Sequence, residues 1–357
     1  MLNKVNVGMI GCGGIAMGKH LPALAKIPEA QVTAFFDVAY ERGEEAKSKY
    51  GTHDARVYTN VHELLNDPNV HVVHVCTPND THAEISIAAM EAGKHVLCEK
   101  PMAKTAIDAQ RMLDTSERTG RKLSIAYQNR FRRECLWLNE ACRNGELGEI
   151  YLAKAHAVRR RAVPTWGVFL DLEKQGGGPL IDIGTHALDL ALWFMNNYEP
   201  KTVLGTSYRK LAEQGSKANE WGPWDPSKFT VEDSAFAMIT MKSGATVWLE
   251  SSWALNTLDV DEAKVSLSGT KAGADMKGGL RVNGEEHGRL YTKEVQLGSA
   301  WGGDVPNDAA EQEARAWIHA ILNDESPVVT AKQGLVVQQI LEAVYESANK
   351  GQAISFV

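Results

Sequence analysis

The sequence lacks the features that direct a chain to a membrane or to nucleic acid. No apolar stretch in its 357 residues reaches the roughly 20 residues that a membrane span needs. The first residues show no succession of basic, apolar and small-residue regions, so no signal peptide is expected. Acidic residues outnumber basic ones by 45 to 38, which gives a formal net charge of -7 and no general basic surface. The one exception is the short basic cluster at 159–166, for which a local surface or site role is favoured over nucleic-acid binding.

Cysteine is also scarce, and no two cysteines are spaced as CxxC. Several of them lie in apolar, strand-like runs, where a thiol behaves as a small buried side chain. We therefore expect reduced thiols in a cytoplasmic protein, with no zinc or other metal site. The five cysteines are Cys12, Cys76, Cys98, Cys135 and Cys142.

The length and composition indicate a globular protein of two domains. A chain of 357 residues exceeds the roughly 100–200 residues of an ordinary domain. Hydrophobic residues make up 44% and charged residues 23% of the chain, which argues against disorder.

The first part of the chain alternates strand-like and helix-like segments. Apolar, β-rich runs that are followed by helix-like segments or turns occupy residues 4–10, 31–37, 70–76, 95–99 and 122–127. Apolar strands that alternate with helices predict a parallel sheet covered on both faces. The predicted fold class is therefore α/β, with a first domain over residues 1–124.

A glycine-rich turn lies between the first strand and the first helix. Residues 11–16 follow a GxGxxA pattern, in which the first glycine makes the turn and the second lets the backbone approach a pyrophosphate. The small last residue allows close packing, and the N-terminus of the helix attracts phosphate groups. The pattern predicts a dinucleotide-binding, or Rossmann, domain with cofactor contacts at Gly11, Gly13, Gly14, Ile15 and Ala16.

The identity of the dinucleotide is indicated by Asp37, which ends the second strand. A carboxylate at this place accepts hydrogen bonds from the adenosine ribose. It would repel a 2′-phosphate, so NAD is favoured over NADP. Arg42 follows closely in the sequence, and use of NADP as well therefore stays open.

A third loop that could contact the cofactor follows the strand at 70–76. Ligands of open parallel sheets lie beyond the carboxyl ends of the strands. Cofactor contacts are therefore predicted here, and a simple turn that begins the next helix is the alternative. The predicted contacts are Thr77, Pro78, Asn79 and His82.

The alternation stops at residue 125, and the pattern changes to strands in succession. β-rich runs begin near residues 201, 234, 245, 263 and 282, with turn signals between neighbours that suggest antiparallel pairing. Helical patterns cover 308–322 and 333–349. A second, α+β domain is predicted over residues 125–357.

One helix of this second domain, over residues 179–195, carries chemical groups on a mainly apolar surface. Asp182, His186 and Asp189 are spaced by four and three residues and so share one face of an α-helix. Unpaired charge is costly in such a buried helix. The glycine run at 176–178 before it is expected to be flexible. A site role is favoured over a purely structural Asp–His pair.

Taken together, these segments resemble the glucose–fructose oxidoreductase, inositol dehydrogenase and rhizopine-catabolism (Gfo/Idh/MocA) family. The resemblance spans the whole chain and rests on the order and spacing of the GxGxxA turn, Asp37, "TPNDTHAE", "EKP" and "GGGPLIDIGTHALD". It implies a Rossmann domain, a second domain with a large open antiparallel sheet, and a homodimer or homotetramer. Family members use a nicotinamide cofactor to oxidise or reduce sugars, cyclitols and their derivatives.

The resemblance assigns the catalytic role to Lys100, the lysine of "EKP". Lys100 follows a buried strand, and Pro101 biases its backbone away from the helical region. A cis bond between these two residues is expected to fix the direction further. An ammonium group there can stabilise charge that develops on the substrate oxygen. Glu99 and Gln128 are expected beside the cofactor.

The resemblance also implies roles for the residues of the helix over 179–195. His186 would act as general acid and base, since imidazole titrates near working pH. Asp182 would orient the substrate or tune the charges of Lys100 and His186. The division of proton transfer between Lys100 and His186 stays open.

Substrate contacts are predicted at three groups of side chains. Arg130 follows the last strand of the first domain, and Trp166 ends the basic cluster. Lys100, Asp182 and His186 complete the set. Tryptophan faces suit the apolar faces of a sugar ring.

The predicted function is hydride transfer between nicotinamide and a ring hydroxyl or ketone of a polyhydroxylated substrate. The alternative is an enzyme that retains NAD and uses it for redox-assisted cleavage of a glycoside. A cofactor-binding sensor without turnover is disfavoured, because all three catalytic candidates are present in the sequence.

Overall fold

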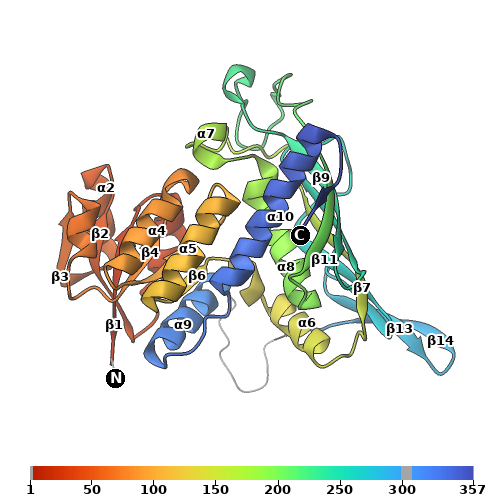
Figure 1. Cartoon of the computed structure of the whole chain (residues 1–357), viewed down its shortest axis with the longest axis horizontal. Coiled ribbons are helices and arrows are strands. Elements are labelled where there is room, and N and C mark those ends of the chain that lie inside the picture. The colour runs from red at the N-terminus through yellow and green to blue at the C-terminus, as the bar shows by residue number, and fades with distance from the viewer. Residues whose placement is uncertain (1–2, 299–307, 357) are drawn as a thin grey trace. The chain divides into compact units, whose positions relative to one another are not determined.

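The structure, a computed structural model, describes residues 3–298 and 308–356 and divides into two compact units (Figure 1). The first unit comprises residues 3–131 and 308–335 of the described chain. The second comprises residues 132–298 and 336–356. None of the described helices is both long and apolar enough to serve as a membrane span.

The first unit is built on a six-stranded sheet whose registered pairs are all parallel. Its order is β3-β2-β1-β4-β5-β6, so the direction of winding reverses between β1 and β4, where ligands of such sheets bind. The strands are β1 (Val5–Ile10), β2 (Ala30–Phe36), β3 (Gly51–Tyr58), β4 (Val72–Val75), β5 (His95–Cys98) and β6 (Leu123–Ile125). The predicted parallel sheet is confirmed. Strand β3 was not predicted, because its polar sequence is not typical of a buried strand.

The first unit's helical segments connect these strands. They are η1 (Ala16–His20), α1 (Leu21–Leu24), α2 (Tyr40–Tyr50), α3 (Val61–Leu65), η2 (Asn79–Thr81), α4 (His82–Glu91), α5 (Ala106–Thr119), η3 (Gln128–Phe131) and α9 (Ala309–Leu322). Strand β1 is apolar, and Val5, Val7 and Met9 are fully buried. The sheet therefore has a helix-covered core that fixes the ends of its strands.

Helix α9 returns from the C-terminal part of the chain to the first unit. Trp317, Ile318 and Ile321 pack in one apolar core with Leu24 and Val32. The predicted boundary at residue 124 placed this helix in the second domain, whereas α9 belongs to the first compact unit of the structure. Sequence order could not show the return, because the apolar face of α9 fits the core of either domain.

The second unit is a nine-stranded sheet covered on one face by helices. Its order is β14-β13-β12-β11-β7-β10-β9-β8-β15, and only β7 and β10 form a parallel pair within the described residues. The strands are β7 (Ile150–Val158), β8 (Pro200–Tyr208), β9 (Ser234–Met241), β10 (Thr246–Ser252), β11 (Asp261–Gly269), β12 (Ala272–Asp275), β13 (Arg281–Glu286), β14 (Arg289–Glu294) and β15 (Ile354–Ser355). The predicted α+β domain is confirmed, with a sheet that is mixed rather than wholly antiparallel.

The helices of the second unit include the one that carries the candidate catalytic residues. They are α6 (Arg133–Arg143), α7 (Leu172–Gln175), η4 (Leu180–Gly184), α8 (Thr185–Met195), η5 (Pro226–Lys228) and the larger part of α10 (Ala331–Lys350). Helix α8 packs on β7 and β11, and η4 packs on β10. The sheet therefore fixes both the π-helical η4 and the α-helix that continues it.

Candidate active site

Three neighbouring strands of the first unit end at the same edge of the sheet. Ile10 of β1 pairs with Val75 of β4, and Val75 pairs with Cys98 of β5. The residues that follow these strands therefore leave the sheet side by side. The glycine turn, the loop after β4 and the Glu99–Lys100 turn are brought together in this way.

The glycine turn has the form that a dinucleotide requires. Gly11 has a φ of 86°, and a Cβ atom there would lie 2.7 Å from the carbonyl oxygen of Cys76. Only glycine fits such a position. A Cβ atom on Gly13 or Gly14 would meet no atom within 4 Å, so the backbone borders open space that a pyrophosphate can occupy. Ala16 is fully buried against the core, as the pattern predicts.

Asp37 fixes the turn from the end of β2. Its Oδ2 accepts a hydrogen bond of 2.8 Å from the Cys12 N–H, and its Oδ1 accepts one of 2.8 Å from the Ala39 N–H. A carboxylate has about four acceptor positions, so two remain for ribose hydroxyls. Asp37 therefore also holds the glycine turn in place, a role that could not be predicted from the sequence.

Replacing Asp37 by asparagine is expected to weaken NAD binding about tenfold or more and NADP binding less. The substitution keeps the size of the side chain but removes the charge that favours an unphosphorylated ribose. Fluorescence titration of the protein with each cofactor measures the two affinities. Equal losses for NAD and NADP would show that Asp37 only supports the turn.

His82 connects the loop after β4 with the Lys100 turn. The ring is fully buried, with Nδ1 2.8 Å from the carbonyl oxygen of Pro101 and Nε2 2.9 Å from that of Thr77. Both ring nitrogens thus face backbone carbonyls and connect the two loops, and the direct cofactor contact of His82 stays a prediction. Thr77 and Asn79 are half-buried, and Pro78 is exposed.

The turn that carries Lys100 is held by the residue before it. The Lys100 N–H donates a hydrogen bond of 3.0 Å to Oε2 of Glu99. The Lys100–Pro101 peptide bond is cis, as expected from the sequence. The Lys100 side chain is half-buried at this edge of the sheet. The backbone on both sides of Lys100 is therefore held by Glu99 and Pro101, which sets the point from which the lysine side chain extends.

Glu99 is the centre of a buried network of charges. Its Oε1 lies 2.9 Å from Nζ of Lys19 and 2.8 Å from Nε2 of His20. Lys19 also lies 3.1 Å from Oε2 of Glu313 and 3.2 Å from Oε1 of Gln128. Burial alone would raise the pKa of Glu99, but Lys19 and His20 hold that pKa well below its ordinary value. Glu99 thus contacts Lys19 and His20, and Gln128 contacts Lys19. These contacts are separate from the predicted role of Glu99 and Gln128 beside the cofactor.

The network continues into the sheet through a pair of histidines. Nδ1 of His20 lies 3.1 Å from Nδ1 of His74, and both rings are buried. Burial lowers the pKa of both residues, so both are neutral near pH 7. A neutral His20 must donate from Nε2 to the Glu99 carboxylate. Its Nδ1 therefore accepts from His74. Neither histidine was predicted to belong to the site.

These neutral histidines make the free energy of unfolding depend on pH. The unfolded chain binds protons near the ordinary pKa of 6.5, whereas the folded chain does not, so stability is lost as the pH falls below about 6.5. Each such histidine contributes up to about 1.4 kcal/mol per pH unit. His74→Gln should flatten this slope in denaturant unfolding series, and His53→Gln, on the surface, should not. Equal slopes for wild type and His74→Gln would contradict this account.

In the second unit, the helix with the catalytic candidates begins with a π-helical turn. We expected a regular α-helix, but residues Leu180–Gly184 form a π-helix that continues into α8. Asp182 is half-buried, and His186 and Asp189 are buried. The carboxylate of Asp182 accepts a hydrogen bond of 3.1 Å from Nε1 of Trp253. Such π-helical turns occur often at functional sites.

Glu232 holds the start of this π-helix and was not predicted. Its carboxylate accepts hydrogen bonds from the N–H groups of Gly178, at 2.8 Å, and Leu180, at 3.1 Å. The Tyr345 hydroxyl donates a third, at 2.8 Å. Burial raises the pKa of Glu232 to about 6. When it is ionised, the negative charge of the Glu232 carboxylate stabilises the helix, because it lies at the positive end of the helix dipole.

The glycine run before the helix is tightly packed rather than flexible, which corrects our expectation. A Cβ atom on Gly177 would lie 2.0 Å from the Tyr345 hydroxyl oxygen, and one on Gly178 would lie 2.3 Å from the Glu232 carbonyl oxygen. Both positions therefore require glycine. The run brings the helix close to Glu232 and Tyr345 and so fixes the position of Asp182.

The two predicted substrate residues outside the catalytic group differ in their surroundings. Arg130 is fully buried and donates hydrogen bonds to the Val328 carbonyl, at 3.2 Å, and to Gln333, at 2.9 Å. The guanidinium therefore supports the fold of the first unit, and the contact of Arg130 with substrate stays a prediction. Trp166 is 52% exposed, which leaves its ring available to a ligand.

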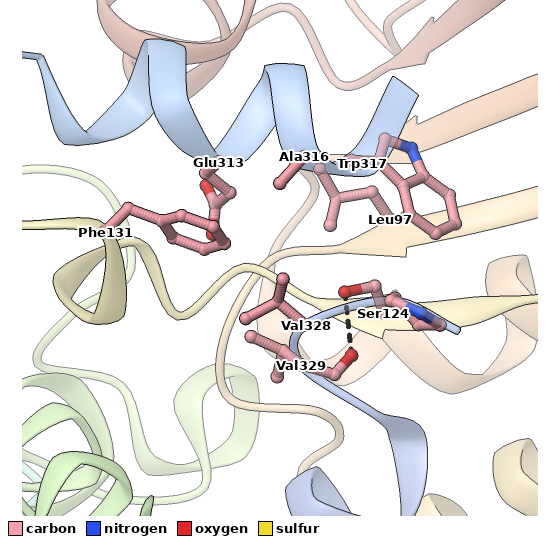
Figure 2. A pocket seen from close by; sticks show the side chains of 9 residues that line it. Leu97, Ser124, Phe131, Glu313, Ala316, Trp317, Val328 and Val329 are labelled. Atoms are coloured by element: carbon pink, nitrogen blue, oxygen red, sulfur yellow. Dashed lines mark hydrogen bonds between the residues drawn. The ribbon is translucent and has the colours of Figure 1, made fainter. Parts of the chain in front are cut away.

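One pocket of the first unit is too small to hold a cofactor. Figure 2 shows it between α9, the ends of β5 and β6, and the segment with Val328 and Val329. Ser124 closes one side with a hydrogen bond of 2.9 Å to the Val329 carbonyl. The volume of about 10 Å³ has room for one water molecule and not for a cofactor.

Comparisons with known proteins match the two units in turn. Residues 5–127 match the model of an oxidoreductase family described as an NAD-binding Rossmann fold, and residues 139–356 match the C-terminal alpha/beta domain of that family. The chain is 35% identical to D-glucoside 3-dehydrogenase of Escherichia coli K12 over 353 residues, 99% of this chain and 97% of that protein. It is 32% identical over 248 residues to myo-inositol 2-dehydrogenase of Thermotoga maritima, which covers 70% of this chain and 68% of that protein.

A solved structure with the same fold covers the whole chain. The aldose-aldose oxidoreductase of Caulobacter crescentus, complexed with glycerol, superposes with a TM-score of 0.79 at 25% identity. The match covers 99% of this chain and 100% of that one. With its glycine turn, its Asp37 and both family domains, the chain belongs to the Gfo/Idh/MocA family of NAD-binding oxidoreductases.

Proposed function

We propose that the protein oxidises a ring hydroxyl of a sugar or cyclitol with NAD, and that D-glucosides oxidised at ring position 3 are the first substrates to test. The observation that carries this proposal is the place of Lys100, which leaves β5 at the sheet edge where the glycine turn leaves β1. A lysine there lies on the side of the sheet where the cofactor binds. The identity of 35% to a D-glucoside 3-dehydrogenase supports the class of substrate.

In this proposal the residues of the first unit bind the cofactor and polarise the substrate. Gly13 and Gly14 hold the pyrophosphate, and Asp37 holds the ribose. Bound NAD supplies the acceptor for the hydride that leaves the ring carbon. The Lys100 ammonium donates a hydrogen bond to the substrate oxygen and stabilises the negative charge that develops there. Glu99 holds the backbone of Lys100 during this step.

The residues of the second unit complete the reaction. The His186 imidazole takes the hydroxyl proton, since an imidazole exchanges protons near neutral pH. Asp182 orients the substrate hydroxyl or the imidazole, and Trp253 holds Asp182 through a hydrogen bond of 3.1 Å. Asp189 supports His186 one turn further along the helix. The exposed face of Trp166 covers an apolar face of the sugar ring.

The test is the stoichiometry of the products. The purified protein is incubated with NAD and with a panel of methyl D-glucosides, free aldoses and inositols. The proposal predicts equal amounts of NADH and a ring ketone from one subgroup of the panel. Glycoside cleavage without net formation of NADH would contradict the dehydrogenase reaction. It would favour the alternative, an enzyme that retains NAD and uses it to cleave a glycoside. A faster reaction with NADP than with NAD would contradict the proposed cofactor preference.

We also propose that the protein is a cytoplasmic homodimer or homotetramer that associates through the outer face of the second sheet. All five cysteines are free thiols, which suits a reducing compartment. Leu204 and Trp248, both 47% exposed, flank Met238 in a cross-strand row. Exposed apolar rows of this kind are typical of subunit interfaces. Trp248→Glu should lower the mass measured by light scattering, and a wild-type monomer would contradict the proposal.

A further inference from the structure

We propose that the second unit carries a further sugar-binding subsite, which holds the part of a glycoside beyond the oxidised ring; this rests on the proposed function. The subsite is a hollow of about 500 Å³ between the end of β7, the segment at 220–221 and the start of β11. Such a volume falls in the range of about 300–1,000 Å³ of small-molecule sites. The residues that line it include Arg159, Arg160, Arg161, Glu220, Trp221, Asp261 and Glu262.

The charges of the subsite indicate a neutral ligand. Its lining includes three arginines and three carboxylates, so its formal charge is zero. Nε of Arg159 donates a hydrogen bond of 2.6 Å to Glu262, and Arg161 donates one of 2.7 Å to Asn256. A phosphate or a nucleic acid would require an excess of positive charge. A polyhydroxylated ligand fits better, because its hydroxyls can accept from the arginines and donate to the carboxylates.

The aromatic surface of the subsite is Trp221, which is 38% exposed and firmly held. The guanidinium carbon of Arg159 lies 5.3 Å from the centre of the Trp221 ring, and the Trp166 ring lies 4.9 Å away, edge to face. The Thr165 hydroxyl donates a hydrogen bond of 2.7 Å to the Trp221 carbonyl. An ordered and exposed ring of this kind suits the apolar face of a sugar.

The loop that carries Trp221 is fixed by a buried asparagine. The side chain of Asn219 is buried, accepts a hydrogen bond of 2.8 Å from the Val163 N–H and donates one of 2.9 Å to the Val163 carbonyl. It also donates one of 2.8 Å to the Gly222 carbonyl. These bonds join the loop to the strand-end segment that follows the arginines. The subsite is thus formed before a ligand binds, which lowers the entropic cost of binding.

A row of aromatic rings connects the subsite with the helix that carries Asp182. The ring centres of Trp221 and Trp166 are 4.9 Å apart, those of Trp166 and Phe169 are 5.8 Å apart, and those of Phe169 and Trp253 are 6.3 Å apart. Trp253 donates the hydrogen bond to Asp182. The hollow lies at the far end of this row from Asp182. It therefore suits a second ring or an aglycone rather than the ring that is oxidised.

The test compares a short and a long substrate in one variant. Trp221→Ala should lower kcat/KM for a disaccharide of two D-glucose units about tenfold more than kcat/KM for methyl D-glucoside, mainly through KM. Leu258→Ala removes an apolar side chain that is 88% exposed and should leave both values unchanged. Equal losses for the two substrates in Trp221→Ala would overturn the subsite.

A binding experiment separates the subsite from the proposed reaction. Calorimetric titration of the NAD-loaded wild type with the disaccharide, at a temperature and time that allow little turnover, should show binding that weakens about tenfold in Trp221→Ala. This result supports the subsite even if neither glucoside is oxidised, in which case only the proposed reaction fails. No binding to the wild type, or equal affinities of wild type and Trp221→Ala, would overturn the subsite whatever the rates are.

Discussion

Replacing Lys100 by alanine is expected to lower kcat for a glucoside by about 10³-fold while the affinity for NAD changes little. The loss follows from the place of the ammonium group, which stabilises charge on the substrate oxygen only as the reaction proceeds. Cofactor binding should persist, because the contacts of Gly11 and Asp37 do not involve the Lys100 side chain. Initial rates and a fluorescence titration with NAD measure the two quantities separately.

Two variants make the Lys100 experiment specific. Lys104→Ala removes a half-buried lysine from the same connection between β5 and α5 and should keep most of the activity. Lys100→Arg keeps a positive charge but changes its reach and shape, and should recover only part of the rate because a planar guanidinium cannot place its donors where the ammonium group does. Loss of NAD binding in Lys100→Ala, with normal turnover at saturating cofactor, would remove Lys100 from the catalytic role.

His186→Ala should lower kcat by about 10²-fold and flatten the dependence of kcat on pH between pH 5 and 8. The imidazole is buried in a helix that Glu232 holds at its start and the sheet holds along its length. Its removal therefore takes away a proton acceptor without moving its neighbours far. Steady-state rates over a pH series measure the effect.

The control for His186 is a histidine on the surface. The side chain of His319 is 65% exposed in α9, and His319→Ala should leave both the rate and its pH profile as in the wild type. A pH profile of His186→Ala that matches the wild type would assign proton transfer to Lys100 instead. A lower rate with an unchanged profile would indicate that His186 orients the substrate.

Local sequence patterns were sufficient where a feature depends on neighbours in the chain. The apolar run of β1 and the GxGxxA turn predicted both the parallel sheet and the open space beside Gly13. Pro101 after Lys100 predicted a fixed turn, and the structure has the cis bond that we expected there. Trp166 was predicted to contact substrate from its place between the arginines and the glycine run; its ring is 52% exposed, and the contact stays a prediction.

Features that depend on distant segments could not be predicted from such patterns. Glu99 meets Lys19 and His20, some 80 residues earlier, and Lys19 in turn meets Glu313 of α9. Nothing in the local sequence of α9 indicates that its carboxylate faces a buried lysine. For the same reason the sequence did not show that α9 joins the first compact unit.

In the second unit, too, contacts between distant segments could not be predicted from local sequence patterns. Glu232 precedes β9 in a segment that reads as an ordinary polar connection, yet it binds the start of the helix with Asp182. The glycine run looked flexible because glycines are free when nothing lies near them. Here Tyr345 and the Glu232 backbone lie so close that only glycine fits.

The central claim is that a ring carbon gives its hydrogen to nicotinamide, and isotope transfer tests it most directly. Methyl D-glucoside carrying deuterium at ring carbon 3 is incubated with the protein and NAD, and the reduced cofactor is analysed by mass spectrometry. The account predicts one deuterium in each NADH, with an equal amount of ketone and a slower rate than for the unlabelled glucoside. Deuterium that stays in the sugar while the cofactor is reduced would contradict oxidation at that position, and a bound glucoside with no NADH would contradict the dehydrogenase reaction for this substrate.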